Sequence, residues 1–205
     1  MIEIRLHGRG GQGTVTAAEL IAQAAFLDEK FSQAFPSFGI ERRGAPVEAY
    51  ARISDKPITL HSKIYEPDYL LIQDPTLLNL TEVRLGVTKK TFVVINTEKS
   101  PAAFKKIFPG NTIQTIPATQ IALAILGKPI INTILLGAFA GVCGLLDPKS
   151  LTAAITARFK KEIAEKNLKA MNTAYCHCSA DSKYCFTAEK CKIAVDGGQN
   201  FSVTC

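Results

Sequence analysis

The sequence predicts an α/β fold: an open, mostly parallel sheet with flanking helices and one antiparallel element, followed by a Cys-rich C-terminal tail. Two short, continuously apolar runs, 69–72 and 92–95, are typical of parallel strands buried on both faces. Helix-like segments separate the strand-like ones, as expected when parallel strands are joined by crossover connections. The composition changes near Asn172, after which Cys, Ser, Gly and Asp are frequent and helical periodicity is absent.

The individual elements follow from local patterns along the chain. Residues 2–6 form a short strand, and residues 14–27, rich in Ala and Leu without Gly or Pro, form the clearest helix. Residues 31–35 are a second candidate strand. Residues 46–53 alternate apolar and polar side chains, which indicates a strand exposed on one face. We further expect a strand at 112–116 and helices at 101–107, 118–126, 133–145 and 149–166.

Length and charge limit the possible classes of protein. The 205 residues fit one domain, which we place at residues 1–171, with 172–205 as an appended tail of unknown role. A hydrophobic content of 47% argues against disorder, and the net charge of +6 comes from scattered basic residues. Scattered basic residues exclude a nucleic-acid interface but suit a small anionic ligand. The first residues lack the pattern of a secretory leader, so we expect a cytoplasmic protein.

The uncharged stretch 129–146 has 18 residues, the lower limit for a membrane span. Its Asn132, its glycines and the charges that flank it favour a buried helix and no membrane association. The glycines at 137, 141 and 144 would let another backbone approach closely on one helical face.

A glycine-rich segment, Gly8-Arg9-Gly10-Gly11-Gln12-Gly13, connects the first strand to the first helix. The glycines at 8, 10 and 13 match the dinucleotide fingerprint, in which a tight turn and a helix N-terminus favour phosphate. The ribose-binding acid of that fingerprint, expected about 20 residues further on, is missing. Three interpretations stay open: a nicotinamide dinucleotide, another phosphorylated ligand, or glycines that only allow a helix and a strand to approach.

A second segment, FPSFGIERRGAP at residues 35–46, combines a rigid Gly- and Pro-rich backbone with charge. The planar guanidinium groups of Arg42 and Arg43 suit a phosphate or a carboxylate, and Glu41 could orient one of them. An ordinary solvated turn with a surface ion pair is the alternative.

Together with Asn132-Thr-Ile-Leu-Leu-Gly-Ala138, these two segments resemble the gamma subunits of the 2-oxoacid:acceptor oxidoreductase family over about residues 1–175. The Arg-Arg-Gly-Ala-Pro form is more similar to the branch that includes pyruvate:ferredoxin oxidoreductase than to the 2-oxoglutarate branch. The resemblance implies a Rossmann-like domain associated with coenzyme A and with assembly. It further implies that thiamine diphosphate and [4Fe-4S] clusters lie on partner subunits, namely thiamine-binding alpha and beta and ferredoxin-like delta, which pass electrons to ferredoxin.

Under this interpretation the coenzyme A site comprises Gly8, Arg9, Gly10, Gly11, Gln12, Gly13, Glu41, Arg42 and Arg43. We expect no catalytic residue, because His7, His61 and His177 form no catalytic pattern and no thiamine-binding Gly-Asp-Gly segment occurs. His7 could touch a ligand, but an imidazole with its hydrogen bonds satisfied at a strand end is the simpler interpretation. The alternatives are a self-contained NAD-binding oxidoreductase and a non-catalytic assembly scaffold.

The tail carries Cys176, Cys178, Cys185, Cys191 and Cys205. Their spacing matches neither a ferredoxin motif nor paired Cys-x₂-Cys knuckles, and we assign no metal ligand. Bound zinc or a cluster, partial disulfides and free thiols remain open for this segment.

Overall fold

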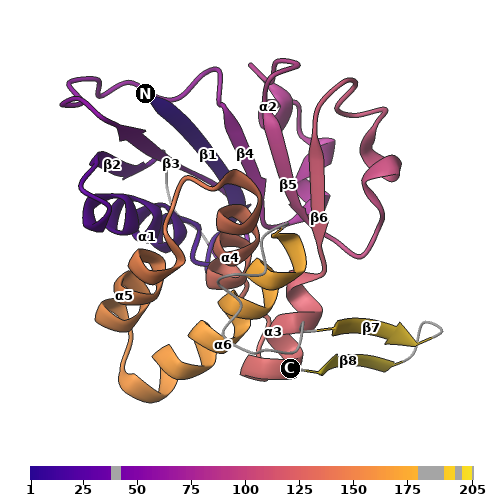
Figure 1. Ribbon diagram of the computed structural model, residues 1–205. Helices are drawn as coiled ribbons and strands as arrows, with labels where there is room; N and C mark the ends of the chain where they lie inside the picture. Colours follow the sequence, from indigo (N-terminus) through magenta and orange to yellow (C-terminus); the bar gives the residue numbers. More distant parts are fainter. Residues whose placement is uncertain (38–42, 180–191, 197–199, 205) are drawn as a thin grey trace.

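The computed structural model describes residues 1–37, 43–179, 192–196 and 200–204. Six strands form one sheet in the order β2-β3-β1-β4-β5-β6 (Figure 1). They are β1 (Ile2–Arg9), β2 (Phe31–Pro36), β3 (Pro46–Ser54), β4 (Tyr69–Ile72), β5 (Phe92–Asn96) and β6 (Ile113–Ile116). β3 is antiparallel to both of its neighbours, and the other pairings are parallel. The predicted open, mostly parallel sheet with one antiparallel element is therefore confirmed.

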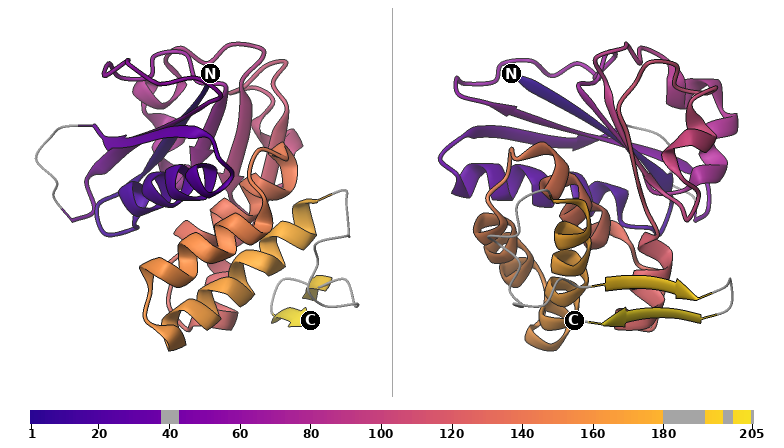
Figure 2. Two further views of the ribbon diagram at one scale, coloured as in Figure 1. Left: turned by 60° about the vertical axis from the view of Figure 1, so that its left-hand side comes forward. Right: turned by 45° about the vertical axis from the view of Figure 1, so that its right-hand side comes forward.

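The long helices lie on one side of this sheet, as the two views in Figure 2 show. They are α1 (Thr14–Leu27), α3 (Ala118–Leu126), α4 (Asn132–Cys143), α5 (Pro148–Arg158) and α6 (Lys161–Cys178). Short helical segments pack against the other face of β4 and β5: η1 (Pro75–Asn79), α2 (Thr81–Arg84) and η2 (Pro101–Phe104).

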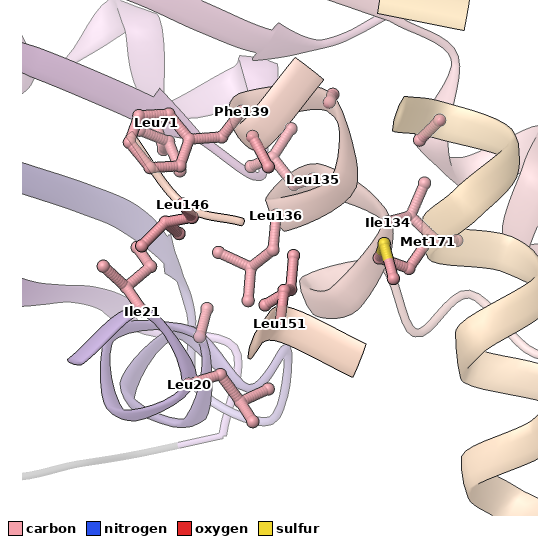
Figure 3. Close-up of a cluster of buried hydrophobic side chains, with 14 of the residues drawn as sticks. Leu20, Ile21, Leu71, Ile134, Leu135, Leu136, Phe139, Leu146, Leu151 and Met171 are labelled. Carbon is pink, nitrogen blue, oxygen red and sulfur yellow. The ribbon is translucent and has the colours of Figure 1, made fainter. Parts of the chain in front are cut away.

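The larger apolar core fills the space between the sheet and the long helices. Figure 3 shows Leu136 of α4 facing Leu151 of α5, with Leu20 of α1 nearby and Phe139 beside Leu71 of β4. The neighbours of Leu71 in β4 point the opposite way and join a second cluster under the short helical segments. Burial on both faces explains why β4 and β5 are continuously apolar in sequence.

Helices α4 and α6 touch through glycine. A Cβ on Gly137 would lie 2.1 Å from the Met171 carbonyl oxygen, and one on Gly141 would lie 2.7 Å from that of Tyr175. The expected close approach is confirmed at these two positions. Gly144 acts differently, because it ends α4 with a φ of 61° and a Cβ there would meet nothing within 4 Å. Among the described residues, no helix combines the length and the apolar character that a membrane span needs.

Several predicted element boundaries are wrong. The helix expected at 101–107 is the short 3₁₀ helix η2, and the segment 149–166 is two helices separated at Phe159 and Lys160. The second of these, α6, continues to Cys178, past the change in composition. Its buried positions keep helical spacing through Ala170, Thr173 and Ala174, a periodicity that the polar composition conceals. The proposed division of the chain at residue 171 therefore falls inside a helix.

Beyond α6, two antiparallel strands, β7 (Lys192–Asp196) and β8 (Asn200–Thr204), form a hairpin, and β8 lies against α3 (Figure 1). Cys143 and Cys178 carry free thiols. The expectations for Cys185, Cys191 and Cys205 lie outside the described residues.

Candidate functional site

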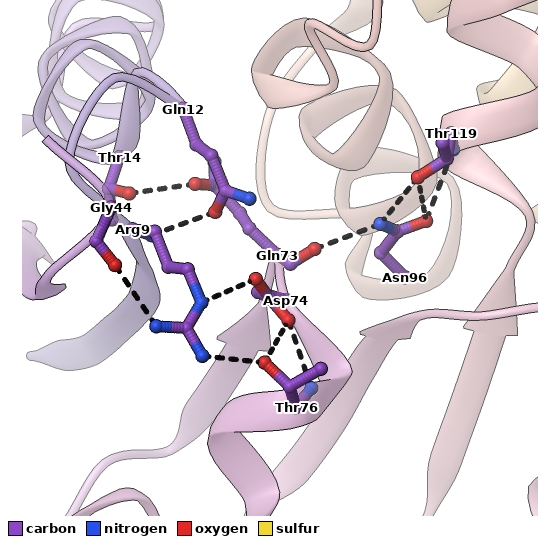
Figure 4. A network of polar contacts seen from close by, with 9 residues as sticks. All are labelled: Arg9, Gln12, Thr14, Gly44, Gln73, Asp74, Thr76, Asn96 and Thr119. Carbon is purple, nitrogen blue, oxygen red and sulfur yellow. Dashed lines mark hydrogen bonds and ion pairs between the residues drawn. The ribbon is translucent and has the colours of Figure 1, made fainter.

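The glycine-rich segment 8–13 lies where the order of the strands reverses. The chain leaves β1 through α1 toward β2 and β3 on one side, whereas β4, β5 and β6 follow on the other side. Ligands of open α/β sheets bind beyond the carboxyl ends of the strands at such a switch point. Figure 4 shows polar side chains gathered there from the ends of β1, β4 and β5.

Three of the glycines are required by crowding or by backbone conformation. A Cβ on Gly8 would lie 2.2 Å from Thr14 Oγ1 and 2.4 Å from Gln73 Oε1. Gly11 and Gly13 have φ angles of 92° and 75°, and a Cβ on Gly13 would also lie 2.6 Å from Asn132 Nδ2. Larger residues would therefore displace these neighbours or strain the backbone.

Gly13 is the N-cap of α1, and this helix has neither a side-chain cap nor an acidic residue in its first turn. The first N–H groups of a helix have no partners within it and carry partial positive charge. The N-terminus of α1 thus offers backbone donors to an anion such as a phosphate.

Hydrogen bonds join the two sequence motifs directly. Gly10 N donates to Ala45 O at 2.9 Å, and Gly44 N donates to Gly10 O at 3.0 Å. Arg43 pairs with Gly10 in an isolated bridge, and its Cγ lies 3.8 Å from the position of a Cβ on Gly11. The structure therefore brings Gly8–Gly13 and Arg43 together, whereas Glu41 and Arg42 lie outside the described residues.

The side chain of Arg9 connects the same loop to β4. Its Nε donates to Asp74 Oδ2 at 2.7 Å, and its terminal nitrogens donate to Thr76 Oγ1 at 2.7 Å and to Gly44 O at 3.0 Å (Figure 4). Gln12 Oε1 accepts from Arg9 N at 2.7 Å and closes the turn. These contacts indicate that Arg9 and Gln12 hold the loop in shape. A direct contact of either with a ligand stays a prediction.

A second line of contacts crosses the switch point beneath the loop. Thr14 Oγ1 donates to Gln73 Oε1 at 2.7 Å, and Asn96 Nδ2 donates to Gln73 O at 2.9 Å and to Thr119 Oγ1 at 3.0 Å. The sequence motifs did not include Gln73, Asn96 or Thr119. A signal existed, because Gln73 and Asn96 are the polar residues at the ends of two apolar strands whose carboxyl ends share one edge of the sheet.

On the sheet face away from α1, charged side chains of β1 and β3 are buried. His7 Nε2 and Arg5 Nε lie 3.5 and 3.7 Å from Glu48 Oε1, and neither has a hydrogen-bond partner among the described residues. The expectation that His7 is a satisfied imidazole is therefore wrong for Nε2. Desolvation, aided by the nearby Arg5 cation, lowers the pKa of His7 to about 3. Glu48 also accepts a hydrogen bond from Tyr50, whose pKa is raised by burial and by this contact.

The sheet order and the loop at its switch point define a Rossmann-like α/β domain. The profile of the pyruvate ferredoxin/flavodoxin oxidoreductase family matches residues 3–176, and the chain belongs to this family. The residues after 176 lie outside that match.

Curated relatives agree with this assignment. The chain is 55% identical over 175 residues to pyruvate synthase subunit PorC of Methanocaldococcus jannaschii, covering 85% of this chain and 96% of that protein. It is 49% identical over 177 residues to the common gamma subunit of the pyruvate/ketoisovalerate oxidoreductases of Pyrococcus furiosus, with the same two coverages. The recognised resemblance to the gamma subunits of this family is confirmed.

Solved structures share the fold. The crystal structure of the pyruvate oxidoreductase subunit PORC from Thermotoga maritima has a TM-score of 0.75 at 34% identity, covering 85% of this chain and 94% of that chain. A 2-oxoglutarate:ferredoxin oxidoreductase from Magnetococcus marinus has a TM-score of 0.72 at 19% identity, covering 86% of this chain but 31% of that chain. The fold of this domain therefore also occurs as part of a much longer polypeptide.

Proposed function

We propose that this chain is the gamma subunit of a multi-subunit cytoplasmic 2-oxoacid:ferredoxin oxidoreductase, with pyruvate as the 2-oxoacid, and that its glycine-rich loop binds coenzyme A. The complex decarboxylates the 2-oxoacid oxidatively and transfers the acyl group to the coenzyme A thiol, while ferredoxin takes up the electrons. Thiamine diphosphate and [4Fe-4S] clusters belong to the alpha, beta and delta partner subunits.

The observation that carries this proposal is the uncapped N-terminus of α1 at the switch point, with Arg43 beside it. Coenzyme A carries phosphate groups, and backbone N–H groups together with a guanidinium suit them. In this role the α1 N-terminus holds a phosphate, and Arg9 and Gln12 keep the loop in shape for it.

The order of the strands gives the NAD-binding alternative less support. In nicotinamide-binding folds, the strand after the first helix lies next to the first strand and ends in the ribose-binding acid. Here β3 occupies that place, and β2 lies at the edge of the sheet and ends at Pro36. Coenzyme A needs no such acid.

Kinetics of the assembled complex test the proposal. Gly10 is not among the glycines with positive φ, so Gly10→Val needs no forbidden backbone conformation. We expect this variant to raise the KM for coenzyme A far more than it changes the KM for pyruvate. An equal loss in the coenzyme A-dependent reaction and in the acid-only reduction of a viologen dye would contradict a coenzyme A site and favour the scaffold alternative.

Activity of the chain by itself is a separate test of the subunit assignment. We expect the purified chain with pyruvate, coenzyme A and thiamine diphosphate to reduce no viologen dye, because thiamine and cluster chemistry belong to the partners. Sustained reduction at the rate of the complex would contradict the assignment.

A further inference from the structure

The side chain of Gln73 is locked beneath the glycine-rich loop. The residue follows β4 directly and is 1% exposed. Its backbone N donates to His7 O at 2.8 Å, and its carbonyl accepts from Asn96 at 2.9 Å. The backbone contacts on both sides therefore fix where the amide lies.

The amide points into the loop. Its Oε1 accepts from Thr14 Oγ1 at 2.7 Å, in the first turn of α1, and lies 2.4 Å from the position that a Cβ on Gly8 would take. Gly8 therefore makes the space that the amide of Gln73 occupies.

The other end of the amide is unpartnered. Gln73 Nε2 is buried and has no hydrogen-bond partner in the part of the chain that the structure describes. Turning the amide over would direct Nε2 at Thr14, but it would take away the acceptor of the Thr14 hydroxyl. A buried N–H without an acceptor is unfavourable, and such groups in native proteins call for an explanation.

The surroundings indicate what the missing acceptor is. The first turn of α1 has no acidic residue, and Asp74 is already engaged by Arg9 and Thr76. The side-chain oxygen of Gln12, also near Gly8, already accepts from Arg9 N. The first turn of α1, which Thr14 joins to this amide, supplies backbone N–H donors, and the amide adds one more. A set of donors around a helix N-terminus is complementary to an oxygen that carries negative charge.

We propose that Gln73 Nε2 donates to an oxygen of the phosphate bound at the N-terminus of α1, and that Gln73 is a specificity-determining residue of this site. The inference rests on the proposed coenzyme A site and adds a residue from β4 that neither sequence motif contains. A carboxylate at this position would repel the phosphate, and an apolar side chain could not donate to it.

The test uses the assembled complex with three variants. Thr14→Val/Gln73→Met replaces both hydrogen-bonded partners with apolar groups of similar shape, and Gln73→Glu replaces the donor with a charge. Gln114→Glu is the matched control, because its amide donates to Thr115 O on the edge strand β6. For each protein, calorimetry measures the Kd of coenzyme A, of phosphate-free pantetheine and of inorganic phosphate, and a thermal melt gives the midpoint without ligand.

We expect the double variant to melt no lower than the wild type, because it removes the unpartnered donor together with its neighbour. Its Kd for coenzyme A should rise by about tenfold or more, the value of one hydrogen bond to a charged group. Gln73→Glu should weaken coenzyme A binding further. The affinity of this variant for inorganic phosphate should fall in parallel, whereas its affinity for pantetheine should not change. The control variant should bind all three ligands as the wild type does.

The outcomes separate the two claims. If the wild type binds coenzyme A and the double variant binds it equally well, the role of Gln73 is overturned and the proposed function stands. A lowered midpoint with unchanged affinity would make the amide purely structural, which also overturns the inference. No binding of coenzyme A by the wild-type complex would overturn both.

Discussion

Arg9 Nε donates to Asp74 Oδ2 at 2.7 Å, which joins the end of β1 to the N-cap of η1 after β4. This ion pair spans the switch point of the sheet. Burial favours the neutral carboxyl of Asp74, but hydrogen bonds from Thr76 and Arg9 outweigh it and hold the pKa below its ordinary value of 3.8.

Asp74→Asn should therefore destabilise the protein at neutral pH by about 1–2 kcal/mol, allowing for the partial exposure of Arg9. Because the folded pKa is lowered, the wild-type advantage is complete above pH 3.8 and is lost as the pH falls through the lowered pKa. Urea unfolding of both proteins between pH 7 and 3 measures the difference. An advantage that already disappears near pH 6 would contradict this account.

The buried His7 should make the free energy of unfolding depend on pH in a higher range than Asp74 does. The pKa of His7 is lowered to about 3 from its ordinary 6.5, so the unfolded chain binds a proton in this range while the folded chain does not. Stability should fall as the pH drops below 6.5, by up to about 1.4 kcal/mol per pH unit. His7→Gln should remove this slope, as measured by unfolding at pH 7.5 and 5. If stability depends on pH equally in both proteins, His7 takes up a proton in the folded protein over this range as it does in the unfolded chain, which would contradict the lowered pKa.

The contact between α4 and α6 should not tolerate a side chain at Gly137. A Cβ there would meet the Met171 carbonyl at 2.1 Å, so Gly137→Ala should cost about 1–3 kcal/mol by overpacking. Gly144→Asn is the matched control, since a Cβ there meets nothing and Asn tolerates its positive φ. Equal thermal midpoints for the two variants would contradict the close packing.

Substitutions of Arg42 and Arg43 test whether the loop at 35–46 contacts a ligand. Arg→Lys keeps the charge but loses the planar fork, so a functional arginine should lose about 1.5–3 kcal/mol of binding. Each variant is made separately in the assembled complex, and kcat/KM is measured for coenzyme A and for pyruvate. If neither variant lowers either value by more than about threefold, roughly 0.65 kcal/mol, the loop is only a solvated turn.

Much of this architecture is predictable because each element carries its own local signal. The apolar runs of β4 and β5 and the Ala-rich α1 reflect how each element is buried. The alternation in β3 predicts the strand correctly, but the expected exposed face is wrong, because Tyr50 and Arg52 on that face are buried as well. The extent of α6 escapes prediction, because its C-terminal half packs against α4 at Gly137 and Gly141, far away in sequence. The composition of α6 itself does not show that α4 lies beside it.

The candidate site is predictable only in part for a similar reason. The spacing of the glycines and the unusual composition of the loop around Arg43 identify these residues from sequence. Gln73, by contrast, lies about 60 residues away from the glycine-rich loop in sequence. It reaches the loop only because β4 pairs in parallel beside β1. Similarly, the sequence does not show that the imidazole of His7 is unsatisfied. Only the pairing of β1 with β3 reveals that Glu48 Oε1 lies 3.5 Å from His7 Nε2 without forming a hydrogen bond.

The most direct test of the central claim is a titration of the full-length, ¹⁵N-labelled chain with coenzyme A, followed through its backbone amide signals. If the N-terminus of α1 holds a phosphate, the N–H signals of Gly11, Gly13 and Thr14 should shift on addition of coenzyme A, since a bound anion would sit against these groups. Phosphate-free pantetheine should leave them in place. Unchanged signals at saturating coenzyme A, or shifts confined to residues away from the loop at 8–13, would contradict the proposed site.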